Sequence, residues 1–186
     1  MQHKVKLTVL DKKLYPELQR QYCADPDSGA CPCYHIGDEF IFERYGDRDD
    51  FWHMGLGTLT RTAADPDTVA GGAKMPHCSE AWDAISRYIY TGLQGGSIMR
   101  GWMNDERVMI TCCSDGTRPV IFRIERIDYR VMRAEDTNAL RKALLGVDGV
   151  TEVRLREGFA EIYTEDSITD ETLLAAARPC GVTAIE

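Results

Sequence analysis

Seven cysteines stand out in a chain of 186 residues. Thiolates bind zinc and iron–sulfur clusters, and they act as nucleophiles or redox groups where their pKa is lowered. Because the count is odd, the cysteines cannot all pair with one another in disulfides. Three interpretations of each cysteine therefore stay open: a metal ligand, a reactive thiol, or a small buried apolar side chain.

Charge and hydropathy narrow the class of protein. A net charge of -8 and a sequence pI near 5.1 argue against nucleic acid or an anionic membrane as a partner, since both need a basic face. No stretch approaches the roughly 18 to 20 apolar residues that cross a bilayer, and residues 1–10 lack the apolar core of a signal peptide. We therefore expect a cytoplasmic protein, in which a permanent disulfide framework would be unusual.

The first part of the chain is predicted to be a small mixed α/β domain. Polar–apolar alternation predicts a strand over residues 3–10. The four-residue spacing of Leu14, Leu18 and Tyr22 predicts one apolar face of a short helix. Glycines and prolines interrupt residues 55–76, which predicts a loop.

Two later elements lie next to cysteines. Ser79 is predicted to be the N-cap of a helix that follows Cys78. Residues 107–113 and 119–127 are predicted to pair as a β-hairpin, because turn-forming residues separate two apolar runs. Cysteines at such element ends can converge from separate segments of the chain.

From about residue 127 the pattern changes. The predicted elements are a strand at 127–133, a helix at 137–145, strands at 150–156 and 159–164, a helix at 170–178 and a final strand at 182–185. This βαββαβ order is the ferredoxin-like plan. We therefore predict an α+β protein of two domains: a small mixed domain with a β-hairpin over residues 1–127, and a ferredoxin-like domain over residues 128–186.

Several motifs of the first domain carry a resemblance. They are the strand from Lys4 to Leu10, Cys31-Pro32 with Gly37-Asp38-Glu39-Phe40, Cys78 with Trp82-Asp83-Ala84-Ile85, the turn Gly95-Gly96, and the run from Cys112 to Arg126. In these motifs the domain resembles a small prokaryotic family of unassigned function. It departs from that family at Glu80, which replaces a tryptophan, at Cys33, which stands where an aromatic residue is expected, and in residues 55–76, which look like an insertion.

The second domain carries a different resemblance. Through Ala143-Leu144, Val147, Gly149-Val150 and Val153 it is similar to the heavy-metal-associated domain of copper chaperones. The family's M-x-C-x-x-C metal motif falls on residues 131–136, where both cysteines are missing. Because soft-metal binding needs those thiolates, we interpret this domain as a docking module for a second copy of the chain or for another protein.

The first resemblance singles out four cysteines at the family's motif positions: Cys31, Cys78, Cys112 and Cys113. We predict that they bind zinc or an iron–sulfur cluster in a protein of accessory or sensor type. Successive side chains of a strand point to opposite faces, so only one of the adjacent pair can face the site without a bulge. The remaining position is then open to His77, His35, Cys33 or an exogenous ligand.

Two alternatives use no metal. Cys78 precedes a predicted helix, where backbone N–H groups favour a thiolate, and His77 and Arg118 are candidate neighbours. It would then be a nucleophile, or a redox thiol paired with Cys31 or Cys112. The other alternative is a structural module that dimerises through the second domain. Whether the chain is an enzyme stays open at this point.

Overall fold

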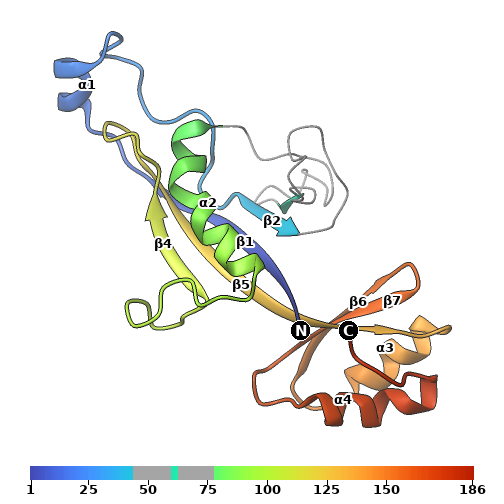
Figure 1. Ribbon diagram of the computed structural model, residues 1–186. Coiled ribbons are helices and arrows are strands. Elements are labelled where there is room, and N and C mark those ends of the chain that lie inside the picture. The colour runs from blue at the N-terminus through green and yellow to red at the C-terminus, as the bar shows by residue number, and fades with distance from the viewer. Residues whose placement is uncertain (44–59, 63–77) are drawn as a thin grey trace. The chain divides into compact units, whose positions relative to one another are not determined.

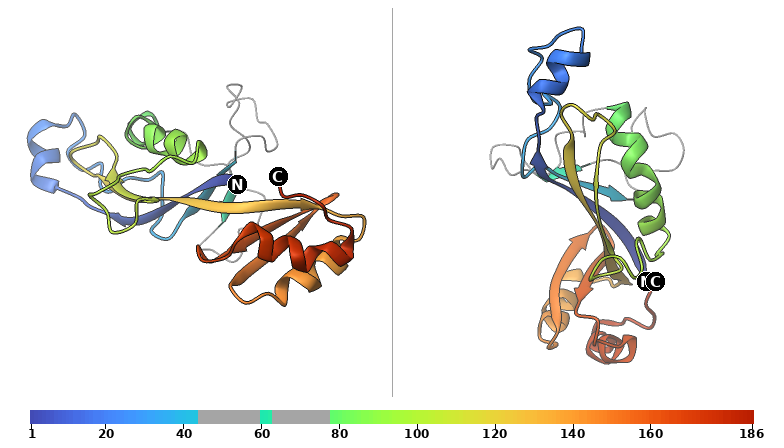
Figure 2. Two further views of the ribbon diagram at one scale, coloured as in Figure 1. Left: turned by 60° about the horizontal axis from the view of Figure 1, so that its bottom comes forward. Right: turned by 90° about the vertical axis from the view of Figure 1, so that its left-hand side faces the viewer.

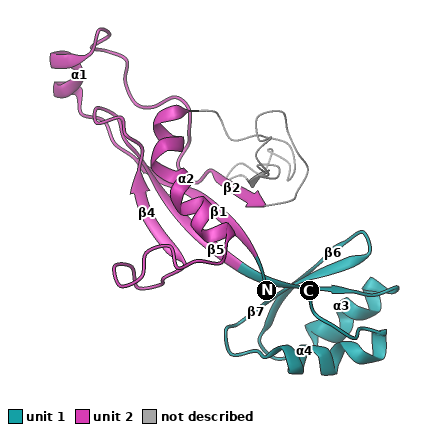
Figure 3. Ribbon diagram, in the orientation of Figure 1, with its two compact units in different colours: residues 1–2, 128–186 teal, residues 3–127 magenta. Residues whose placement is uncertain are grey.

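The computed structural model describes residues 1–43, 60–62 and 78–186. The chain divides into two compact units, which Figure 3 colours separately. We call residues 3–127 the cysteine unit and residues 1–2 with 128–186 the C-terminal unit. Both contain helices and antiparallel strand pairs, so the structure is α+β, as predicted.

Strands and helices alternate in the cysteine unit. Its elements are β1 (Gln2–Lys12), α1 (Pro16–Tyr22), β2 (Glu39–Glu43), β3 (Thr60–Thr62), α2 (Ser79–Leu93), β4 (Val108–Cys112) and the first part of β5 (Val120–Arg133). The strands lie in the order β3-β2-β1-β5, and β4 pairs with β5 (Figure 1). The predicted β-hairpin is therefore confirmed.

The core of the cysteine unit lies between the sheet and α2. Val5 pairs with Phe42 and Leu7 with Phe40 across β1 and β2, and all four side chains are fully buried. Alternation along each strand places these side chains on one face of the sheet. α2 lies along that face and buries Ile85 and Ile89 against it, together with Val120, Phe122 and Ile124 of β5 (Figures 1 and 2).

The buried face of α1 differs from the prediction. Leu14 and Tyr22 are exposed, whereas Gln19 is buried. The helix begins only at Pro16, so Leu14 precedes it. Gln19 is buried because its side-chain amide donates to Gly29 C=O at 3.1 Å and accepts from Gly29 N–H at 3.2 Å. The buried face of α1 is therefore set by the hydrogen bonds of Gln19, and not by the four-residue spacing of apolar side chains.

Two other local predictions are corrected. Cys78 is the N-cap of α2, in an extended conformation and with no side-chain capping bond, while Ser79 is the first helical residue. Residues 60–62, within the stretch predicted to be a loop, form β3 and pair antiparallel with β2. The free edge of β2 offers backbone N–H and C=O groups with which a short segment can pair. The turn-forming residues around this segment gave no sign of that pairing. The rest of residues 55–76 lies outside the described residues.

The C-terminal unit contains the second part of β5 and most of the elements predicted after residue 127. These are α3 (Thr137–Leu145), β6 (Val150–Arg156), β7 (Phe159–Thr164), α4 (Asp170–Ala177) and a 3-10 turn (Arg178–Cys180). β7 pairs antiparallel with both β5 and β6. The core residues of this unit include Met132, Leu140, Leu144, Ile162 and Leu173, all fully buried, and both helices contribute to it (Figure 2).

Three of the predicted strands differ from the structure: two are joined into one, and the last does not form. Residues 119–127 and 127–133 form one continuous strand, β5, rather than two. Residues 182–185 form no strand. Gly181, at a φ of +80°, turns the chain, and Glu186 N–H donates to Val131 C=O at 2.9 Å, but no ladder develops before it. In the described part of the chain, no helix is long and apolar enough to cross a membrane.

Candidate functional site

Cys31 and Cys33 lie in the loop between α1 and β2, on either side of Pro32. The backbone bends at residues 32 and 33. Both cysteine side chains are partly buried and pack against the core of the cysteine unit. Proline fixes its own φ near -65°, so the bend holds the two thiols in one local arrangement.

The loop is held firmly on both sides of these cysteines. Before them, the side-chain amide of Gln19 bonds to Gly29 through both its nitrogen and its oxygen. After them, Tyr34 is only 1% exposed and meets the rings of Phe40 and Phe122 edge-on, at centroid distances of 6.3 and 5.4 Å. Lys12 Nζ also donates to Tyr34 C=O at 2.7 Å.

The turn that follows Tyr34 fastens the same loop to β1. Gly37, at a φ of +90°, donates its N–H to Val9 C=O at 2.8 Å, and Val9 N–H donates to Asp38 C=O at 2.8 Å. The buried carboxylate of Asp38 accepts the backbone N–H of His35 at 2.8 Å. Glycine suits this position because a positive φ strains other residues.

The start of α2 and the end of β4 approach each other. Ser114 N–H donates to Glu80 C=O at 3.2 Å, and the Ser114 hydroxyl also donates to the Glu80 carboxylate. Glu80 is two residues beyond Cys78, and Ser114 directly follows Cys113. These bonds therefore bring the segments of Cys78 and Cys113 together, although the two cysteines are far apart in the sequence.

The adjacent cysteines at the end of β4 differ in burial. Cys112 is exposed, whereas Cys113 is 8% exposed and belongs to the core. Cys113 bonds to β5 twice: its N–H donates to Val120 C=O at 3.1 Å, and its Sγ accepts Val120 N–H at 3.3 Å. Strand alternation thus assigns the inward place to Cys113.

Four cysteines belong to or pack against the same core as Tyr34: Cys31, Cys33, Cys78 and Cys113. Burial raises the pKa of the Tyr34 phenol, and the thiols of Cys78, Cys33, Cys31 and Cys113 act electrostatically in the same direction. We call Cys31, Cys33, Cys78 and Cys113 the thiol cluster. It combines three segments of the chain: the loop before β2, the N-cap of α2 and the end of β4.

Burial raises the pKa of two thiols of the cluster, Cys33 and Cys113. It is the main reason why the pKa of Cys33 is raised, and Cys31 raises it further by charge and by a side-chain hydrogen bond, with a contribution from Cys78. Burial also raises the pKa of Cys113, against backbone hydrogen bonds from Val120 and Asp115 that lower it. Neither thiol has the depressed pKa of an activated nucleophile.

Arg118 provides positive charge beside the cluster. Its Nε donates to Asp115 Oδ2 at 3.0 Å, and this hydrogen bond is the main reason why the pKa of Arg118 is raised, with Cys31 and Cys23 contributing. Asp115 also accepts the backbone N–H groups of Thr117 and Arg118 at 2.9 and 3.3 Å. The hairpin turn therefore fixes a guanidinium group near Cys31.

The structure brings together only some of the predicted ligands. Cys31, Cys78 and Cys113 join the cluster, and Cys112 does not. The side chain of His35 is 76% exposed, and His77 lies outside the described residues. Cys33, which was one of several candidates for the remaining position, packs against the same core. Among residues 1–43, 60–62 and 78–186, no three His, Cys, Asp or Glu side chains already stand at metal-binding spacing.

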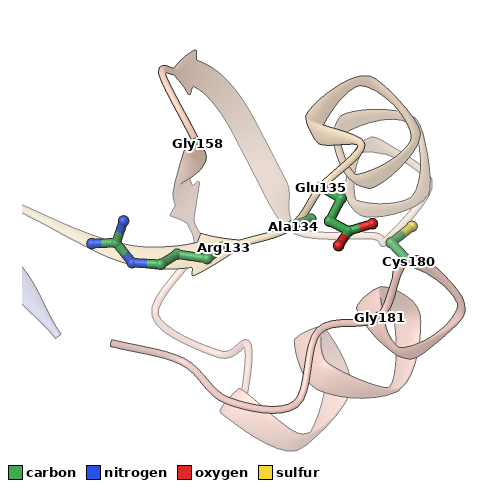
Figure 4. A pocket seen from close by; sticks show the side chains of 6 residues that line it. All are labelled: Arg133, Ala134, Glu135, Gly158, Cys180 and Gly181. Carbon is green, nitrogen blue, oxygen red and sulfur yellow. The ribbon is translucent and has the colours of Figure 1, made fainter.

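The C-terminal unit has a surface pocket of about 590 Å³ where the metal motif of the heavy-metal-associated family would lie. Figure 4 shows its lining, with Arg133 directed away from Glu135 and Cys180. Arg133 pairs instead with Glu186, from Nε to Oε1 at 2.7 Å. One cysteine and one carboxylate do not make a soft-metal site, in keeping with the missing cysteines of the motif.

The chain matches no protein-family model, no curated protein and no solved structure. The two family resemblances therefore rest on the motifs alone. For function, the main observations are the residues and geometry of the thiol cluster.

Proposed function

We propose that the cysteine unit binds a soft metal, as zinc or an iron–sulfur cluster, through the thiol cluster. The observation that carries the proposal is that Cys31, Cys33, Cys78 and Cys113, from three separate segments, all belong to or pack against the core that contains Tyr34. Buried cysteines usually act as isolated small apolar side chains. Four thiols that share one edge of a core offer instead the ligand number of a closed zinc site or a cluster site.

The positions of these cysteines suit metal binding. Cys31 and Cys33 lie in a loop, Cys78 caps a helix and Cys113 follows the last residue of β4. None lies in the middle of a strand or helix, so small side-chain and loop movements can draw the sulfur atoms together. Binding would exchange the thiol protons for the metal, because the thiolate is the form that ligates.

Arg118 and Tyr34 have supporting roles in this proposal. A site with four thiolates and a divalent metal carries net negative charge, and the Arg118 guanidinium near Cys31 offsets part of it. Tyr34 and the phenylalanines around it form an apolar wall that limits access of water. Both features favour a stable bound group over an open nucleophilic thiol.

Metal analysis of the anaerobically purified, 186-residue chain tests the proposal. We expect either about one zinc per chain in a colourless protein, or iron and inorganic sulfide in a brown one. The two results distinguish the two kinds of site. A chain that holds neither metal after gentle anaerobic purification, and that takes up neither on reconstitution, would contradict the proposal.

For the C-terminal unit, we propose a ferredoxin-like plan in which the chain end lies beside β5 without forming the last strand. Supporting this proposal, β5, α3, β6, β7 and α4 follow in the expected order, and β7 lies between β5 and β6. The bond from Glu186 to Val131 returns the chain end to β5, where a fourth strand would pair. Docking of a second copy or of another protein through this unit stays a prediction, as does the use of Cys78 as a reactive thiol.

A further inference from the structure

The spacing of Cys31 and Cys33 permits a direct disulfide between them. Residues two apart in a fully extended chain have Cα atoms about 7 Å apart, near the upper limit for a disulfide. The backbone here bends at residues 32 and 33, which shortens that separation. Both side chains pack against the core of the cysteine unit, so they lie on the same side of the bent loop.

The surroundings of the pair favour oxidation between these two residues. The loop is held at Gly29 by Gln19 and at Tyr34 by Lys12, so the bend is kept while the thiols react. Cys113 is less available because it is buried and its Sγ accepts a hydrogen bond from Val120. Cys112 is exposed and does not belong to the cluster.

A disulfide across so short a loop would be readily reversible. Disulfides gain most of their stability by closing long loops in the unfolded chain, and a three-residue loop gives little of this gain. Short or strained disulfides have more oxidising potentials and act as labile, regulatory bonds rather than permanent ones. The pair is therefore suited to switching under mild changes in redox conditions.

We propose that Cys31 and Cys33 form a reversible redox switch by exchange with a low-molecular-weight disulfide, RSSR. One cysteine thiolate attacks RSSR, forms a mixed disulfide and releases RS⁻, which takes up that cysteine's proton. The second thiolate then attacks the cysteine sulfur of the mixed disulfide, forms the Cys31–Cys33 bond and releases the second RSH. Two protein thiols are oxidised, and one RSSR is reduced to two RSH.

Oxidation removes two ligands from the thiol cluster at once. Only this consequence rests on the proposed metal-binding function, because the disulfide itself forms between thiols in the metal-free chain. The switch would release a bound metal under oxidising conditions and restore its site on reduction. The ratio of small thiols to their disulfides would thus control how much metal the site binds.

Alkylation of the metal-free, 186-residue chain tests the switch. The reduced protein is equilibrated with glutathione and glutathione disulfide, labelled with iodoacetamide and digested with trypsin. Cleavage at arginine gives one peptide over residues 21–44, which holds Cys23, Cys31 and Cys33. We expect the labels on this peptide to fall from three to one as glutathione disulfide increases, with the label left on Cys23, and to return to three after reduction.

Matched variants identify the pair. Cys23→Ser should retain the loss of two labels, whereas Cys31→Ser and Cys33→Ser should each form no internal disulfide, so that any lost label is matched by a glutathione adduct. Glutathione adducts without an internal disulfide in the wild-type chain would overturn the proposal. An internal disulfide in Cys31→Ser or Cys33→Ser would also overturn it, since Cys23 would then be the partner. Metal content is measured separately on the reduced chain, so failure of the metal site and failure of the switch are distinguishable.

Discussion

At the residue scale, the cysteines of the thiol cluster belong to or pack against a core that contains the aromatic rings of Tyr34 and Phe122. Tyr34 and Phe122 close the inner side of the cluster, and burial raises the pKa of Cys33 and of Cys113. Thiols that are mostly protonated exchange only slowly with disulfides, but they become strong ligands when a metal displaces the protons. This chemistry favours a bound group over covalent catalysis at these two residues.

Strand alternation was enough to predict that only one cysteine of the pair at 112–113 faces inward, and the structure identifies Cys113. The place of Cys33 was not predicted beyond one of several candidates. It depends on the bend at Pro32 and on the packing of Tyr34, which joins residues distant in the sequence. Periodicity carries no information about such a loop.

Asp105 makes a prediction about acid stability at this scale. Hydrogen bonds from the Arg107 side chain hold the pKa of Asp105 below its ordinary value of 3.8. A lowered carboxyl pKa stabilises the folded chain above that value, and this contribution is lost as the pH falls through the folded pKa. Asp105→Asn should therefore lower the urea midpoint at pH 7, and the difference should shrink below about pH 4.

The size of the Asp105 effect should be small, because both partners are partly exposed: about 0.2 to 1 kcal/mol at pH 7. The exposed Asp148 provides a matched control, and Asp148→Asn should leave the midpoint unchanged. A midpoint difference for Asp105→Asn that is the same at pH 7 and pH 3 would show that the ion pair is not its source.

At the element scale, the strongly patterned elements were predicted best. α3, β6 and β7 have the predicted boundaries, and the hairpin of β4 and β5 forms around its Asp-Gly turn. Weakly patterned elements failed where tertiary contacts decide. In α1, the hydrogen bonds between Gln19 and Gly29 decide which face of the helix is buried. Residues 182–185 form no strand.

The packing of α2 on the sheet makes a prediction at Gly92. A Cβ at this helical position would lie 2.6 Å from Val5 Cγ2, inside the core. Alanine normally stabilises a helix relative to glycine by about 1 kcal/mol, but overpacking a core costs about 1–3 kcal/mol. We expect Gly92→Ala to lower the free energy of unfolding, measured by urea denaturation.

Asp83, exposed on the same helix, provides the control for Gly92. Asp83→Ala adds a helix-favouring residue without entering the core, so the free energy of unfolding should change by less than about 0.5 kcal/mol. A more stable Gly92→Ala protein would mean that α2 lies further from β1 than the described contact indicates.

At the scale of the whole molecule, the two units differ in what they offer chemically. The core of the cysteine unit is lined by four thiols, whereas the surface pocket of the C-terminal unit is lined by one cysteine, Cys180, and one carboxylate, Glu135. The division of the chain near residue 127 follows a visible change in pattern, within the continuous strand β5. The gathering of the cysteines could not be predicted, because it depends on contacts such as that between Ser114 and Glu80.

The metal-to-chain ratio of two variants tests whether the ligands are those of the thiol cluster. Cys33 belongs to the cluster and Cys112 does not, yet both lie in motifs of the same domain. After anaerobic purification, Cys33→Ser should lose most of the bound zinc, or of the iron and sulfide, while Cys112→Ser should match the wild-type chain. Full metal content in Cys33→Ser, with loss in Cys112→Ser, would contradict the account.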